Sequence, residues 1–175
     1  MRYQAGVDVM NEAEHAYKPL PHVASKNLPT ALARYLDGAD LLKKTQALRL
    51  STVDPAGWPH AALLSAGDMV AMPSGRIRFV LFPQSATTAN LARDGRLTLT
   101  LLLDGGMCEL RLHAHRLAHA SSDVPLAFFE AEVETARNHV APYAVLTQGI
   151  TFELHEPQAV LLRWNRQIAA LRAAA

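Results

Sequence analysis

Residues 76–103 read RIRFVLFPQSATTANLARDGRLTLTLLL, and we interpret this stretch as a strand, a short helix and a second strand. The first part is rich in β-branched and aromatic residues, and the last part alternates leucine with threonine as a half-buried strand does. Pro83 ends the first strand, Ser85 is a typical N-cap residue, and Asp94-Gly95 ends the helix. We expect the rest of the chain to be organised around this unit.

The start of this short helix is a candidate anion site. Ser85, Thr87 and Thr88 bring three hydroxyls close to backbone N–H groups that have no partner within the helix. The alternative is an ordinary capped connector, because serine caps many helices that bind nothing. The sequence leaves both interpretations open.

The composition fits a single soluble domain spanning residues 1–175. The chain has 17 basic and 16 acidic residues, a formal net charge of +1, so nothing points to nucleic acid as a partner. Its only cysteine, Cys108, excludes an internal disulfide and a multi-cysteine metal site. No segment reaches the roughly 20 apolar residues of a membrane span, and the first residues do not resemble a signal peptide. We therefore predict a cytoplasmic protein without a membrane partner.

Hydrophobic periodicity predicts the other elements. Residues 1–27 have little periodicity and are predicted to be an irregular N-terminal arm. Besides the helix at 85–94, helices are predicted at 30–44, 123–138 and 157–172, the last within a C-terminal segment 157–175. Further strands are predicted at 47–53, 58–65, 68–72, 107–118 and 149–155. Tight turns at 54–57 and 104–106 join neighbouring strands, which favours an antiparallel meander that closes on itself.

The strand at 107–118 shows the clearest alternation in the chain. Leu110, Leu112 and Ala114 share one face and are expected to line a barrel. The opposite face carries a polar row, made up of Glu109, Arg111, His113 and His115. This row is either a solvated face, a subunit interface or the wall of a ligand cleft. His113 and His115 share a side, but no third ligand is identifiable by spacing, so no metal site is predicted.

Two short motifs give the chain a family resemblance over about residues 30–120. The first comprises Thr52, Val53, Asp54, Gly57 and Pro59, and the second comprises Ser85, Leu91 and Arg96-Leu97. In this order the motifs resemble the pyridoxamine 5′-phosphate oxidase-like, FMN-binding split-barrel superfamily. The resemblance implies a mainly β (α+β) fold, a six-stranded antiparallel split β-barrel with peripheral helices. It also implies a homodimer with FMN held at the dimer cleft.

The departures from that family concern charge. The oxidases carry phosphate-binding cations at four positions that hold Ala62, Gly67, Ala86 and Thr87 in this chain. Hydrogen bonds to charged groups contribute about 1.5 to 3 kcal/mol each, so FMN affinity is expected to be weak. A family glutamine near the flavin aligns with Met107, and the substrate-binding Arg-x-His element has no counterpart. Pyridoxamine phosphate oxidation itself is therefore rejected.

Two functions follow from the resemblance. The first is an FMN-dependent oxidoreductase that acts on an unknown small molecule, with no catalytic residue identified because the cofactor supplies the chemistry. The second is a dimeric split barrel that has lost flavin and binds or senses a small molecule, and haem binding through a histidine is a third alternative. The predicted cofactor-binding residues are Ala62, Leu63, Leu64, Ser65, Pro83, Gln84, Ser85, Thr87, Thr88 and Arg111. Arg111 is the candidate to offset the phosphate charge. Glu109, Arg111 and His113 of the polar row are predicted to lie at or near the dimer interface.

Overall fold

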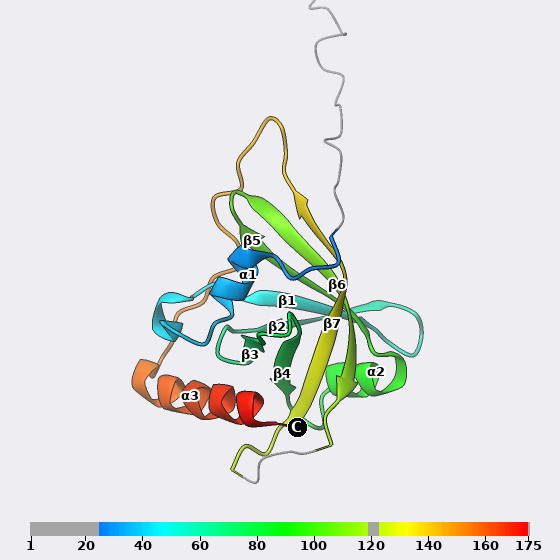
Figure 1. The fold of residues 1–175 in the computed structure, drawn as a ribbon, viewed down its shortest axis with the longest axis vertical. Coiled ribbons are helices and arrows are strands. Elements are labelled where there is room, and N and C mark those ends of the chain that lie inside the picture. The colour runs from blue at the N-terminus through cyan, green and yellow to red at the C-terminus, as the bar shows by residue number, and fades with distance from the viewer. Residues whose placement is uncertain (1–24, 119–122, 175) are drawn as a thin grey trace, which may run out of the picture.

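One antiparallel sheet dominates the structure, with its strands in the order β2-β1-β5-β6-β7-β4-β3. The structure, a computed structural model, describes residues 25–118 and 123–174. Within these residues the strands are β1 (Leu48–Val53), β2 (Pro59–Leu64), β3 (Met69–Ala71), β4 (Ile77–Leu81), β5 (Arg96–Leu103), β6 (Gly106–Arg116) and β7 (Ala127–His139). The sheet curls into a half-barrel in which β5, β6 and β7 form the long wall (Figure 1). The fold is the predicted mainly β split barrel, with seven strands in the described residues rather than six.

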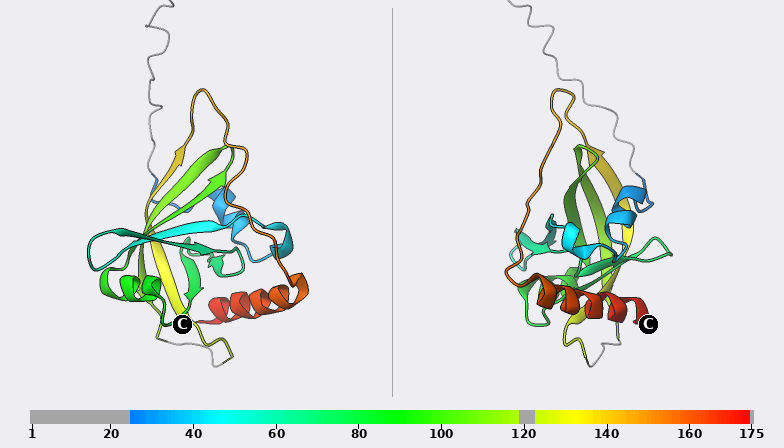
Figure 2. Two further views of the ribbon diagram at one scale, coloured as in Figure 1. Left: turned by 180° about the vertical axis from the view of Figure 1, so that it is seen from behind. Right: turned by 90° about the vertical axis from the view of Figure 1, so that its left-hand side faces the viewer.

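Helices surround this sheet. The described residues contain α1 (Thr30–Tyr35), the 3₁₀ turn η2 (Leu41–Lys43), α2 (Ala86–Asp94) and α3 (Pro157–Ala173). In Figures 1 and 2, α2 and α3 lie on opposite sides of the barrel. Among the described residues, no helix combines the length and apolarity needed to cross a membrane.

The strand–helix–strand unit has the predicted form. Ser85 is the N-cap of α2, and its side chain accepts a hydrogen bond from the Thr88 N–H at 3.1 Å. Gly95 ends the helix in the left-handed conformation, with φ of 76°. The strands at both ends, β4 and β5, lie within the predicted ranges. Local capping rules therefore predicted this unit correctly.

The predicted helix at 30–44 is interrupted. Gly38 and Asp40 both have positive φ values, 74° and 48°, which stop the helix after α1. A Cβ on Gly38 would lie 2.8 Å from Cγ2 of Ile168, so the chain turns here in close contact with α3. Packing against α3 thus divides the expected helix into α1 and η2.

The predicted helix at 123–138 is wrong, because this segment forms the strand β7. Its predicted caps at residues 121 and 122 lie outside the described residues. Glutamate and alanine favour helices, yet Glu130, Glu132 and Glu134 recur at every second position, which is the period of a strand. β7 pairs with β6 on one side and β4 on the other, so tertiary pairing overrides the local propensity.

The predicted strand at 149–155 is also wrong. Only an isolated bridge forms there, between Gln46 and Thr151. β1 already pairs with β2 on one side and β5 on the other, so the returning segment finds no free edge along it. The segment instead runs over the outside of the barrel from β7 to α3 (Figure 2).

The core fills the inside of the half-barrel. The predicted inward residues of β6, Leu110, Leu112 and Ala114, are buried, as the alternation predicted. The rings of Phe79 on β4 and Phe129 on β7 stack with their centroids 5.4 Å apart. This pairing joins the two strands on the side of the barrel that faces α3.

The C-terminal helix is fixed by polar contacts as well as by packing. Nη1 of Arg78 on β4 donates to the backbone oxygens of Leu171, at 3.0 Å, and of Ala174, at 2.6 Å. Nη2 of Arg172 donates to the Asp37 backbone oxygen at 2.7 Å. The helix therefore covers one end of the barrel through contacts with residues distant in sequence.

The predicted N-terminal arm lies mostly outside the described residues. Its described end, Ser25, forms an antiparallel bridge with Ala136 of β7. The Ser25 N–H donates to the Ala136 oxygen at 3.1 Å, and the Ala136 N–H donates to the Ser25 oxygen at 2.7 Å. The chain thus enters the fold along the edge of β7.

Candidate functional site

The outer face of the long wall carries small hydroxyl side chains around one arginine. Because side chains alternate along a strand, Ser51, Thr98 and Arg111 face outward where their neighbours face the core. They lie in one row across the sheet, since Thr98 pairs with both Ser51 and Arg111, and Arg111 pairs with Thr135 of β7. Short side chains on three strands leave a depression beside the long arginine.

This depression is a groove of about 550 Å³. Its lining consists of Ser51, Thr52, Val53, Pro59, Arg96, Leu97, Thr98, Arg111, Leu112, His113, Glu134 and Thr135. The volume lies within the range of about 300 to 1,000 Å³ that is typical of small-molecule sites. An anion-binding cleft needs a cation and nearby hydroxyl donors, and the groove has both.

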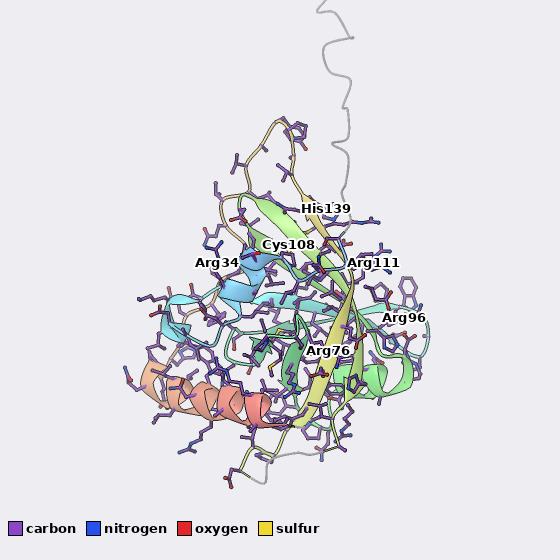
Figure 3. All side chains as sticks on the ribbon, viewed as in Figure 1. Arg34, Arg76, Arg96, Cys108, Arg111 and His139 are labelled. Carbon is purple, nitrogen blue, oxygen red and sulfur yellow. The ribbon has the colours of Figure 1, made fainter. Side chains whose placement is uncertain are left out.

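Arg111 is the most available cation in the groove. Its side chain is 61 % exposed, and its Nε lies 3.7 Å from Oε1 of Glu109. An exposed pair at that distance is weak, so a ligand phosphate could compete for the guanidinium. Figure 3 shows Arg111 and Arg96 on the same side of the barrel, away from α3.

Arg96 is already engaged. Its Nε lies 2.5 Å from Oδ1 of Asp94 and its Nη2 lies 2.7 Å from Oδ2, a two-point contact. These hydrogen bonds from Arg96 lower the pKa of Asp94 to about 2. The pair therefore stays ionised near neutral pH, and Arg96 contributes less to binding a ligand than Arg111 does.

His113 lies at the end of the groove next to α2. It faces Arg96 across β5 and β6. A Cβ on Gly95 would lie 2.9 Å from Cε1 of the His113 ring, so the ring lies against this glycine. The Ala114 N–H also donates to the Gly95 oxygen at 2.7 Å, which joins β6 to the end of α2.

The hydroxyls at the α2 start serve the helix cap. The Ser85 hydroxyl donates to Oγ1 of Thr88 at 3.1 Å, and the Thr88 hydroxyl donates to the Phe82 oxygen at 2.8 Å. Thr87 and Thr88 are buried, while Pro83 and Gln84 are exposed. The groove lining includes Arg111 but no residue from this helix start.

The predicted β2 residues also lie outside the groove lining. Ala62 and Leu64 face inward opposite Leu50 and Leu48, and Leu63 faces outward with 55 % exposure. The Ser65 hydroxyl donates to Oδ2 of Asp68 at 2.6 Å. These residues build the edge of the barrel, and the structure brings none of them to Arg111 in the groove.

The four neutral positions can be located in the structure. A Cβ on Gly67 would lie 2.0 Å from Cγ of Trp164, so the indole occupies the space into which a side chain would extend. Ala62 lies on β2, and Ala86 and Thr87 open α2. At Gly67, therefore, the packing of Trp164 leaves no room for a cationic side chain.

No metal or thiol chemistry emerges from the described residues. Among them, no group of three or more histidine, cysteine, aspartate or glutamate side chains is placed to hold a metal ion. Cys108 is buried, and this desolvation raises the pKa of its thiol to about 11. A thiolate nucleophile is therefore not formed near neutral pH.

Sequence reasoning named Arg111 but missed most of its surroundings. Ser51, Thr98 and Thr135 reach the groove through strand pairing, which only the register reveals. The available signal was the threonine alternation of 96–103, since the threonines of a half-buried strand share its outward face. Thr135 could not be found, because its segment was predicted to be a helix.

Comparison with known proteins identifies a relative of this chain. No protein-family profile matches the chain. The Bacillus subtilis (strain 168) protein YclD, itself uncharacterised, is 34 % identical over 143 residues, which cover 81 % of this chain and 93 % of YclD. That level of identity over most of both chains shows that this protein and YclD belong to the same family.

One solved structure with a TM-score above 0.5 supports the fold. A protein from Lactobacillus delbrueckii, named for pyridoxamine 5′-phosphate oxidase, aligns with a TM-score of 0.52 and 13 % identity over 67 % of this chain and 98 % of its own. HupZ of Group A Streptococcus aligns with a TM-score of 0.47 and 16 % identity over 65 % of this chain and 94 % of its own. The chain therefore belongs to one family with YclD, and it has the split-barrel fold of the solved protein named for pyridoxamine 5′-phosphate oxidase.

Proposed function

We propose that this protein is a homodimeric split barrel that binds FMN in the outer groove and uses it in redox chemistry on a small molecule. The observation that carries the proposal is the groove itself, with Arg111 beside the hydroxyls of Ser51 and Thr98. The solved relative named for pyridoxamine 5′-phosphate oxidase adds support at the level of the fold.

The available donors favour one position for an FMN phosphate. At the α2 start the Ser85 and Thr88 hydroxyls already have partners. A helix dipole contributes only about 0.3 to 1 kcal/mol at an exposed site. Arg111 offers a full charge that Glu109 binds loosely. Arg111 is therefore the better phosphate partner, with Thr98 as a neutral donor.

The proposed affinity is modest. A single arginine replaces the four cations that the oxidases use, and each charged hydrogen bond contributes about 1.5 to 3 kcal/mol. We expect micromolar or weaker FMN binding, equivalent to about 8 kcal/mol or less. When bound, FMN would supply the hydride or electron transfer, while Arg111 and the hydroxyls would bind and orient it.

FMN titration followed by flavin fluorescence tests the proposal. Arg111→Ala is expected to weaken binding at least about tenfold, as loss of a charged hydrogen bond does. Arg163→Ala, on the exposed side of α3, is the matched control and should leave the affinity unchanged. The predicted contact at Ser85 remains a prediction: a similar loss in Ser85→Ala, with Arg111→Ala silent, would place the phosphate at the helix start instead.

A second function is favoured by the neutral positions. Trp164 fills the space beside Gly67, so the phosphate site of the oxidases cannot be restored there without moving α3. A flavin-free split barrel that binds another anionic small molecule is consistent with this. Absorbance of protein purified without added cofactor distinguishes the functions, since flavin and haem have distinct visible bands and an empty barrel has none.

A further inference from the structure

Arg111 and His113 are neighbours on one face of β6. Residues two apart on a strand project to the same side, with about 7 Å between their Cα atoms. Thr98 faces Arg111 directly across β5 and β6. Two nitrogen-bearing side chains and a hydroxyl therefore border one small part of the groove. All three residues line the same groove, so an anion bound there would lie near them.

The His113 ring is held in place by the backbone. It lies against Gly95, where a Cβ would come within 3.0 Å of Nε2 as well as 2.9 Å of Cε1. Gly95 is the C-cap of α2, so the ring lies at the carboxyl end of that helix. The partial negative charge at a helix C-terminus favours a cation nearby. The ring therefore lies at the end of α2 that attracts positive charge.

The surrounding charges leave Arg111 and His113 as the groups facing a ligand. Arg96, opposite His113 on β5, is paired with Asp94 at the end of α2. On β7, the carboxylate of Glu132 contacts Arg76.

Three further charged or titratable groups complete the surroundings. Glu109 precedes Arg111 on the same face of β6, Glu134 lines the β7 side of the groove, and His115 follows His113 outside the lining. Glu134 would oppose an anion, which places the anion toward β5.

We propose that Arg111, His113 and Thr98 form an anion subsite that takes up a proton on His113 when a phosphate- or sulfate-like group binds. The inference rests on the proposed function only for the identity of the larger ligand. Imidazole is the side chain whose charge changes between about pH 5 and 8. Binding to its cationic form links affinity to pH, so the anion is held more tightly in mildly acidic solution.

Sulfate is the appropriate probe, because its charge stays constant over this pH range and it cannot undergo flavin chemistry. The imidazole resonances of His113 are followed by NMR while sodium sulfate replaces sodium chloride at constant ionic strength. We expect the His113 titration to move to higher pH with sulfate, and sulfate to bind about tenfold tighter at about pH 6 than at about pH 8. An unmoved His113 titration would overturn the proposal.

Three variants separate the roles. His113→Gln should reduce the pH effect on sulfate binding to less than about twofold, and Arg111→Ala should weaken binding at both pH values. His115→Gln is the matched control, on the same face of β6 but outside the groove lining, and should behave as the wild type. Equal pH dependence in the His113→Gln protein would overturn the inference.

The outcome is independent of flavin. Sulfate binding coupled to His113, without measurable FMN binding, would support the subsite and reject the flavin function. FMN binding that depends on Arg111 but is unaffected by His113→Gln at either pH would support the flavin function and reject the subsite.

Discussion

Gly67 marks the closest approach between the barrel and α3. A Cβ at this position would lie 2.0 to 2.3 Å from three atoms of the Trp164 ring. Trp164 is buried, so its ring cannot move into solvent. The need for glycine here is steric, and it comes from a residue almost a hundred positions later in the chain.

Replacing this glycine is expected to destabilise the fold. Gly67→Ala should lower the free energy of unfolding by about 1 to 3 kcal/mol, the usual cost of overpacking a core. Urea denaturation of Gly67→Ala, Trp164→Ala and the double variant measures the coupling. The double variant should lose less than the sum of the single losses, because removing the ring makes room for the methyl group. Additive losses would show that the two residues do not meet.

Ser85 is expected to matter for stability more than for binding. Its side chain accepts the Thr88 N–H, and loss of an N-cap costs about 0.5 to 2 kcal/mol. Ser85→Ala should therefore lower the urea midpoint, while Ser74→Ala in an exposed turn should not. Unchanged stability in Ser85→Ala would mean that the cap contributes little to holding α2.

At the scale of elements, β4, β7 and α3 meet at an ion cluster around the buried Glu130. Glu130 on β7 receives hydrogen bonds from Nε of Arg78, at 2.7 Å, and from Nη1 of Arg76, at 2.9 Å. Burial opposes the charge on Glu130, but the two arginines outweigh it and keep the pKa of its carboxyl below the ordinary value. Arg78 also binds the last carbonyls of α3. The Glu130 carboxylate thus positions Arg78, which in turn binds the end of α3.

This cluster predicts a pH-dependent stability. A carboxyl with a lowered folded-state pKa stabilises the protein above its unfolded value, about 4.3, and that contribution disappears as the pH falls through the folded value. Glu130→Gln should cost about 1.5 to 3 kcal/mol near neutral pH, because it removes the charge with which the partly buried Arg78 pairs. The difference from the wild type should narrow in acid, as measured by urea unfolding at several pH values. The exposed Glu153→Gln is the control, and a constant difference at all pH values would contradict the assignment.

The elements differ in how far local sequence could predict them. Ser85 and Gly95 carry their own capping signals, and β5 and β6 alternate clearly, so these parts were predicted correctly. β7 was missed because its glutamates and alanines favour helix locally, while its pairing partners lie elsewhere in the chain. The groove was missed for the same reason: Thr98 and Thr135 acquire a shared site only through the register of three strands. The order and spacing of the motifs predicted the split-barrel fold, because that order relates segments that are distant in the sequence.

At the scale of the whole molecule, the outer face is predicted to join two protomers. Light scattering at micromolar concentration should give twice the 19.1 kDa mass of the chain. Thr100 faces outward between Arg49 and Glu109, just outside the groove lining. Thr100→Lys should weaken the dimer by bringing like charges together, whereas Gln158→Lys on the exposed start of α3 should not. A monomeric wild-type protein would reject the homodimer.

The long-range contacts of β4, β7 and α3 also affect how this chain folds. Arg76 and Glu130 are 54 residues apart in sequence, Arg78 and Ala174 are 96 apart, and Arg172 and Asp37 are 135 apart. Forming each contact requires closing a large loop, which costs chain entropy. The contact order is therefore high, and folding is expected in milliseconds to seconds. During synthesis, β4 cannot pair with β7 until β7 has been made, and Arg78 cannot bind the end of α3 until that helix has been made. Until those residues have emerged, the nascent barrel has an open end and an exposed apolar core, which is the kind of surface through which incomplete folds aggregate.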